Sequence, residues 1–84
     1  MVNRLSFRDK GSKNIRVAIF GAGQAGQMLS TWLPYGQELV CYMDNNKEIR
    51  GSSIDGIPVL SLRQGLRQRP NIIYLAVLNR QWMR

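Results

Sequence analysis

The chain of 84 residues contains no histidine, one cysteine and five acidic residues against twelve lysines and arginines. Histidine, cysteine and grouped carboxylates supply most metal sites and most general acid–base catalysts in proteins. Because the carboxylates form no group beyond Asp44 and Glu48, the sequence predicts neither a metal site nor catalytic residues. Binding without chemistry is therefore the class of function that the composition favours.

The single cysteine, Cys41, lies within an apolar run at residues 39–43, which is typical of a buried strand position rather than a nucleophile. No apolar segment is long enough to cross a membrane or to direct export. An unpaired cysteine without a signal peptide favours a reducing, cytoplasmic location.

Three glycines with G-x-G-x-x-G spacing, Gly21, Gly23 and Gly26, follow a strand-like run at residues 15–20. In this motif the first glycine allows a tight turn, the second a close approach of pyrophosphate, and the third close packing of helix on strand. Apolar residues then recur at helical spacing at Ala25, Met28, Leu29, Trp32 and Leu33. The motif is thus predicted to lie at a strand-to-helix junction.

The first amides of such a helix lack partners within the helix and carry the positive end of its dipole. We therefore predict that the three glycines and the amides of Ala22, Gln24 and Ala25 hold a pyrophosphate. The alternative is a glycine-rich turn that only allows the helix to pack on the strand.

A second candidate residue, Asp44, ends the strand predicted over residues 39–43 and lies 18 residues beyond Gly26. An acid at this distance commonly accepts hydrogen bonds from the hydroxyl groups of an adenosine ribose. Asn45 is expected to assist. Alternatively, Asp44 is a turn residue before Asn45 and Asn46.

The charge of Asp44 would repel a 2'-phosphate, which favours NAD over NADP as the cofactor. Lys47 and Arg50 lie just downstream and would offset that repulsion. NADP and coenzyme A therefore remain alternatives.

The second half of the chain predicts a short edge strand around Pro58, a short helix capped by Ser61, and a strand over residues 72–78. The expected fold is α/β: a partial, Rossmann-like β-α-β-α-β parallel sheet at residues 15–84. Residues 1–14 are predicted to form a basic flexible leader.

Taken together, these motifs resemble the Rossmann-like domain of CapD-type polysaccharide-biosynthesis proteins, the nucleotide-sugar dehydratases and epimerases. The resemblance covers about residues 15–78, and the family commonly carries two or three acids where this chain has Asp44, Asn45 and Asn46. The matching positions are Gly21, Ala22, Gly23, Ala25, Gly26, Asp44, Gly51, Ile54, Gly56, Ile57, Pro58, Val59, Tyr74, Leu75, Ala76 and Val77.

This resemblance implies an NAD(P)-binding, cytoplasmic domain of a nucleotide-sugar dehydratase, epimerase or dehydrogenase in bacterial surface-polysaccharide biosynthesis. In longer family members it commonly follows membrane helices and precedes the catalytic domain. Tyr35, Tyr42 and Tyr74 all lack the lysine four residues on that completes the dehydratase catalytic pair, so this chain alone is expected to be non-catalytic. Two alternatives are a coenzyme A or nucleotide sensor, in which Lys47 and Arg50 meet a 3'-phosphate, and a structural remnant without ligand.

The net charge of +7 raises the question of partners. A nucleic-acid partner is not expected, because no helix-turn-helix pattern or interleaving of aromatic and basic residues is present. The basic leader could contact an anionic membrane surface. If the strands lie in the order third, second, first, both helices cover one face and the other stays bare, which predicts a homo-oligomer or part of a longer chain.

Overall fold

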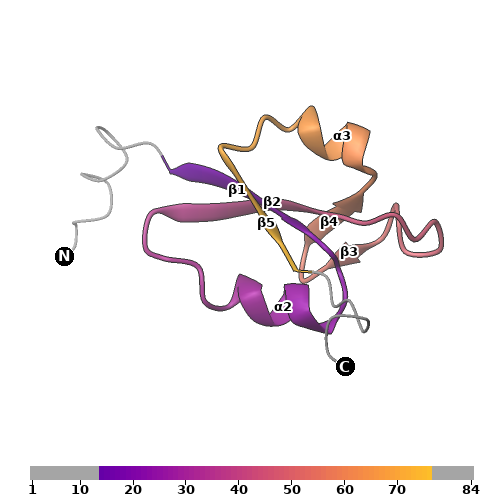
Figure 1. Cartoon of the computed structure of the whole chain (residues 1–84), viewed down its shortest axis with the longest axis horizontal. Coiled ribbons are helices and arrows are strands. Elements are labelled where there is room, and N and C mark those ends of the chain that lie inside the picture. Colours follow the sequence, from indigo (N-terminus) through magenta and orange to yellow (C-terminus); the bar gives the residue numbers. More distant parts are fainter. Residues whose placement is uncertain (1–13, 77–84) are drawn as a thin grey trace, which may run out of the picture.

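The structure, a computed structural model, describes residues 14–76, which form an α/β fold with a mostly parallel sheet and two helices (Figure 1). The basic leader, apart from Asn14, and the end of the strand predicted to reach Leu78 lie outside these residues. The elements are β1 (Ile15–Phe20), α2 (Gln24–Ser30), β2 (Gln37–Met43), β3 (Ser53–Ile54), β4 (Ile57–Leu60), α3 (Leu62–Leu66) and β5 (Ile72–Leu75).

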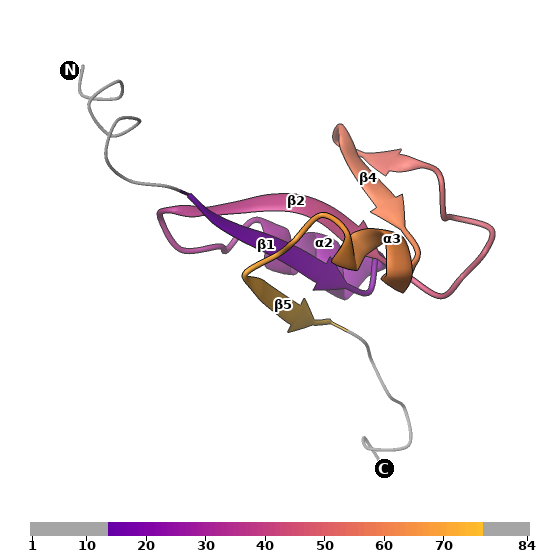
Figure 2. The ribbon, with the colours of Figure 1, turned by 90° about the horizontal axis from the view of Figure 1, so that it is seen from above.

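The five strands lie in the order β3-β4-β2-β1-β5 (Figure 2). β1, β2, β4 and β5 are parallel, and β3 pairs antiparallel with β4. β1 therefore has a parallel neighbour on each side, and its central residues Val17, Ala18 and Ile19 are fully buried. Apolar side chains on both faces are typical of a central parallel strand.

The prediction that both helices cover one face of the sheet is wrong. β5 lies beside β1 on the side away from β2, so the crossover through α3 runs opposite to the crossover through α2. Right-handed crossovers in opposite directions place their helices on opposite faces, and Figure 1 shows α2 and α3 on the two sides of the sheet. The expectation of a bare face assumed that residues 72–78 form the third parallel strand, next to β2. In the structure β4 occupies that position, and residues 72–75 form β5 on the other side of β1.

Two apolar layers follow from this arrangement. On the face of the sheet that α2 covers, Leu29 and Leu33 pack against a cluster whose buried members are Val17, Ile19, Ala22, Tyr42 and Val59. On the α3 side the cluster consists of Ala18, Cys41 and Met43 with partly buried neighbours. Since each face has its own helix, self-association is no longer required to cover the sheet.

β4 is also not the edge strand that Pro58 predicts, because β3 pairs with it on its outer side. Pro58 lies opposite Ser53 of this two-residue strand, whereas Val59 and Leu60 pair with β2. The proline thus falls outside the ladder with β2, where its missing amide would cost a hydrogen bond.

Helix α2 is shorter than its apolar periodicity predicts. The hydroxyl groups of Ser30 and Thr31 donate to the carbonyls of Gln27 and Met28 at 2.6 and 2.7 Å, where the helix ends. Side-chain bonds of this kind compete with the helical ladder. Consequently Trp32 remains 75 % exposed instead of joining the predicted apolar face.

Helix α3 begins as predicted. Ser61 and Gln64 form a reciprocal capping box, in which the Gln64 amide donates to Ser61 Oγ at 3.2 Å and the Ser61 amide donates to Gln64 Oε1 at 3.3 Å. This arrangement satisfies amides that the first helical turn leaves unpaired.

Candidate functional site

The glycine motif forms the turn between β1 and α2, as expected. Gly21 has φ +116°, a conformation that favours glycine, and its amide donates to the Met43 carbonyl at 2.7 Å. Gly23 is the N-cap of α2, and a Cβ added there would meet nothing within 4 Å. The backbone at Gly23 is therefore open to approach by a ligand.

The third glycine has the packing role that its place in the motif predicts. A Cβ on Gly26 would overlap the carbonyl oxygen of Gly21 and lie 3.3 Å from Ile19 Cγ2. Only glycine permits this approach of α2 to the end of β1. The helix therefore starts directly on the glycine turn.

Asp44 is joined to this turn, although the two are far apart in sequence. Its Oδ2 accepts a hydrogen bond from the Ala22 amide at 2.8 Å, and its own amide donates to the Leu60 carbonyl at 2.9 Å. Oδ1 accepts from the Asn46 amide at 2.8 Å. Asp44 thus forms the local turn bond of the alternative interpretation and also connects the ends of β1, β2 and β4.

One assigned amide has a different partner from the one predicted. The Ala22 amide donates to Asp44 and is not available to a pyrophosphate while that bond is made. Within residues 14–76, the amides of Gln24 and Ala25 have no hydrogen-bond acceptor. Of the predicted phosphate-binding amides, these two remain.

A small cavity of about 190 Å³ lies at the ends of β1 and β2, lined by Phe20, Gly21, Asp44 and Asn45. Its volume is below the range of about 300–1,000 Å³ common for small-molecule sites. It has room for a sugar-sized group and not for a whole dinucleotide. The cavity unites the first glycine with both predicted ribose-binding residues.

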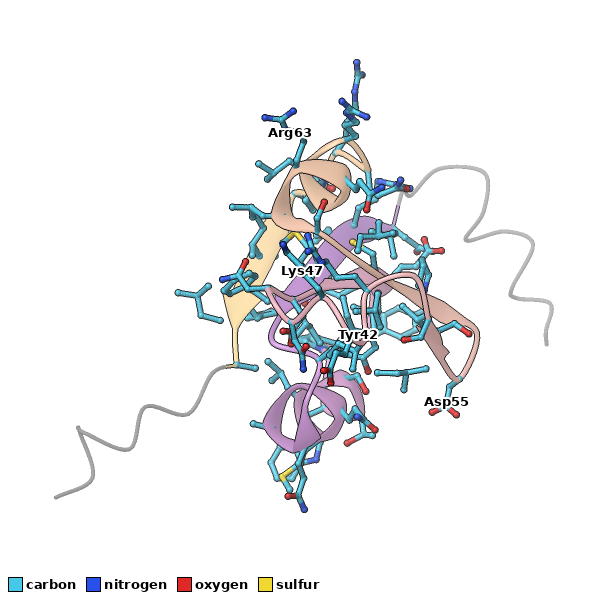
Figure 3. All side chains as sticks on the ribbon, turned by 90° about the vertical axis from the view of Figure 1, so that its right-hand side faces the viewer. Tyr42, Lys47, Asp55 and Arg63 are labelled. Atoms are coloured by element: carbon cyan, nitrogen blue, oxygen red, sulfur yellow. The ribbon has the colours of Figure 1, made fainter. Side chains whose placement is uncertain are left out.

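A larger cavity of about 550 Å³ lies between the loop after β2 and α3, and we call it the cationic cavity. Its lining consists of Lys47, Arg50, Gly51, Ser61, Arg63, Gln64 and Arg67. In Figure 3, Lys47 lies on the side of the sheet below the helix that carries Arg63, whereas Asp55 lies at the β3–β4 turn, away from both Lys47 and Arg63.

Sequence reasoning had grouped Lys47 with Arg50 and missed their meeting with the arginines of α3. The available signal was the four-residue spacing of Arg63 and Arg67, which places both on one side of a helix. Where that side points depends on which face of the sheet α3 covers.

Cys41 is fully buried, as its place in the apolar run indicates. Burial raises the pKa of its thiol, and the positive charge of Arg16 opposes this only in part. The thiol is therefore neutral at pH 7, and a neutral buried thiol is a poor nucleophile.

Residues 14–76 contain no group of three or more histidine, cysteine, aspartate or glutamate side chains placed to hold a metal ion. Nor does any helix there have the length and apolar character needed to cross a bilayer.

Comparison of the chain with protein-family models, curated proteins and solved structures gives no match, so the site rests on its own geometry.

Proposed function

We propose that this domain binds an adenine dinucleotide, NAD or NADP, at the carboxyl edge of its parallel sheet. The observation that carries the proposal is the hydrogen bond between Asp44 Oδ2 and the Ala22 amide at 2.8 Å. This bond brings the acid at the end of the second strand onto the glycine turn after the first. These are the two elements that hold the ribose and pyrophosphate of a dinucleotide.

The strand order supports a Rossmann-like assignment. Counted along the chain, the parallel strands β4, β2, β1 and β5 lie in the order third, second, first, fourth. The doubly wound dinucleotide-binding fold begins with the same order, and its ligand binds beyond the carboxyl ends, where the chain reverses its direction across the sheet. In this sheet the reversal falls between β1 and β5, beside the glycine turn.

The roles of the individual groups follow from their hydrogen bonds. The unpaired amides of Gln24 and Ala25, next to the open backbone of Gly23, would hold the pyrophosphate. Each carboxylate oxygen of Asp44 accepts one backbone bond and retains capacity for a ribose hydroxyl. The Ala22 amide orients Asp44 rather than the phosphate.

We further propose that the domain serves a nucleotide-sugar dehydratase, epimerase or dehydrogenase of surface-polysaccharide synthesis in the cytoplasm. The support is the glycine motif in combination with the G-I-P-V segment at residues 56–59. The catalytic groups would be supplied by another domain or chain. A buried, unpaired Cys41 accords with a reducing compartment.

The test is thermal melting with NAD and NADP on the wild type and on Gly23→Ala, Asp44→Asn and Asp55→Asn variants. Ligand at 100 times its Kd adds about 2.7 kcal/mol, which corresponds to roughly 10–20 °C in a domain of this size. Gly23→Ala puts a methyl group into open space and should reduce the shift with little change in the unliganded midpoint.

Asp44→Asn should also reduce the shift. Asp55→Asn is the matched control, because Asp55 is an exposed hairpin residue with φ 52°, which asparagine tolerates. If the folded wild type shows no shift with millimolar NAD or NADP, the proposed function is wrong.

A further inference from the structure

We propose that the cationic cavity binds a phosphate group carried on the adenosine ribose of the ligand. The ligand is then a ribose-phosphorylated adenine nucleotide, bearing its phosphate at the 2' or the 3' position. This inference rests on the proposed function, because it assigns the ribose to Asp44.

First, the cationic cavity is lined by four positively charged side chains. Lys47 and Arg50 from the loop line it together with Arg63 of α3 and Arg67, the C-cap of α3, and no carboxylate is among the lining residues. Like charges held together repel one another, and a polyvalent anion placed between them relieves that repulsion. A phosphate monoester carries the required charge and several acceptor oxygens.

Second, these cations have no other partner in the described part of the chain. Arg16, by contrast, is held by its Nε and Nη2 atoms, which donate to the Gln68 carbonyl at 3.1 and 2.6 Å. Within residues 14–76, none of the four side chains in the cationic cavity makes a hydrogen bond or an ion pair. Among the described residues, nothing competes with a ligand for their donor groups.

Third, backbone contacts hold both walls of the cavity in place. The Gly51 amide donates to the Val59 carbonyl at 2.8 Å, which ties the loop to β4. On the other wall, the capping box of Ser61 and Gln64 fixes the start of α3, and Gly65 packs closely on Met43. Ordered walls lower the cost of arranging the cations around an anion.

Fourth, the backbone links the cationic cavity to the small cavity at Asp44. The Asp44 amide donates to the Leu60 carbonyl, and the next residue, Ser61, lines the cationic cavity. A phosphate on a ribose held by Asp44 would therefore lie close to the four cations.

Asp44 itself repels such a phosphate, but it is one carboxylate against four cations, and both its oxygens already accept amide hydrogen bonds. The balance of charge therefore reverses the preference for NAD that Asp44 alone predicts.

The test uses two pairs of ligands that differ only in the ribose phosphate: NADP with NAD, and coenzyme A with dephospho-coenzyme A. Calorimetric titration of the full chain should show that at least one phosphorylated ligand binds about tenfold or more tightly than its partner. The preference should weaken as salt is raised, because exposed charges are screened. A preference within the NADP and NAD pair indicates a 2'-phosphate, and a preference within the coenzyme A pair indicates a 3'-phosphate.

The variants are Arg63→Gln with Arg67→Gln, and Lys47→Gln alone in case the double change impairs folding. Both should remove most of the preference and leave the affinity for the unphosphorylated partner nearly unchanged. Arg69→Gln is the matched control, because Arg69 is exposed and outside the cavity.

If NAD and NADP bind and the affinities within both pairs are equal, the inference is overturned and the proposed function stands. A preference that survives in both cavity variants, or that Arg69→Gln removes equally, also overturns it. Absence of binding by all four ligands overturns the inference together with the proposed function.

Discussion

Replacing Gly26 by alanine tests the packing on which the site depends. The added methyl would overlap the Gly21 carbonyl oxygen and lie 3.0 Å from the carbonyl carbon. Both atoms belong to the backbone, and Gly21 is itself tied to β2 through the Met43 carbonyl. The strain can therefore be relieved only by moving α2 away from β1.

Two opposing effects determine how much Gly26→Ala changes the free energy of unfolding. Overpacking a well-packed contact costs up to about 3 kcal/mol, and the rigid backbone on both sides places Gly26→Ala at this upper end. Alanine in a helix gains about 1 kcal/mol over glycine. The expected net loss is about 2 kcal/mol, or a fall of roughly 8–16 °C in the melting temperature.

The assay is thermal melting followed by circular dichroism, with Gly23→Ala as the control. Gly23 belongs to the same turn, yet an added methyl meets nothing within 4 Å, so its melting temperature should change by only a few degrees. If Gly26→Ala melts within 3 °C of the wild type, α2 does not lie on the Gly21 carbonyl and the reasoning is refuted.

Three further changes test other parts of the fold. Gly65→Ala should lower the free energy of unfolding by about 1–2 kcal/mol, because the added methyl overlaps the Met43 side chain. In a double-mutant cycle, Met43→Val should recover part of that loss, and full additivity of the two changes would contradict the contact. Tyr74→Phe removes the hydrogen bond that the Tyr74 hydroxyl donates to Gln37 Oε1 at 2.7 Å, which joins β5 to β2 across β1. The free energy of unfolding in urea should fall by about 1 kcal/mol in the wild type and by nearly nothing in a Gln37→Leu background. Because burial raises the pKa of Cys41, its contribution to stability is fully present below the pKa of an unfolded cysteine and is lost as the pH rises above it. The urea midpoint of the wild type should therefore fall more above about pH 9 than that of Cys41→Ala, and equal slopes would argue against a buried thiol.

Short-range patterns accounted for the turn and both helix starts. Gly21, Gly23 and Gly26 stand where their spacing places them, and Ser61 caps α3 because the capping box involves only four consecutive residues. The end of α2 was missed, since Ser30 and Thr31 compete with the helical ladder while the apolar periodicity continues through them.

By itself, the sequence determined an α/β chain with a glycine turn between a buried strand and a helix, and with an acid at the end of the next strand. Those features depend on backbone conformation and on hydrogen bonds within a few residues. Only the tertiary structure decided that β5 lies beside β1, that α3 covers the second face, and that Arg63 and Arg67 meet Lys47. The side of β1 on which β5 pairs is fixed by contacts between residues more than 50 positions apart, such as Val17 with Ile72, and no local pattern encodes that choice.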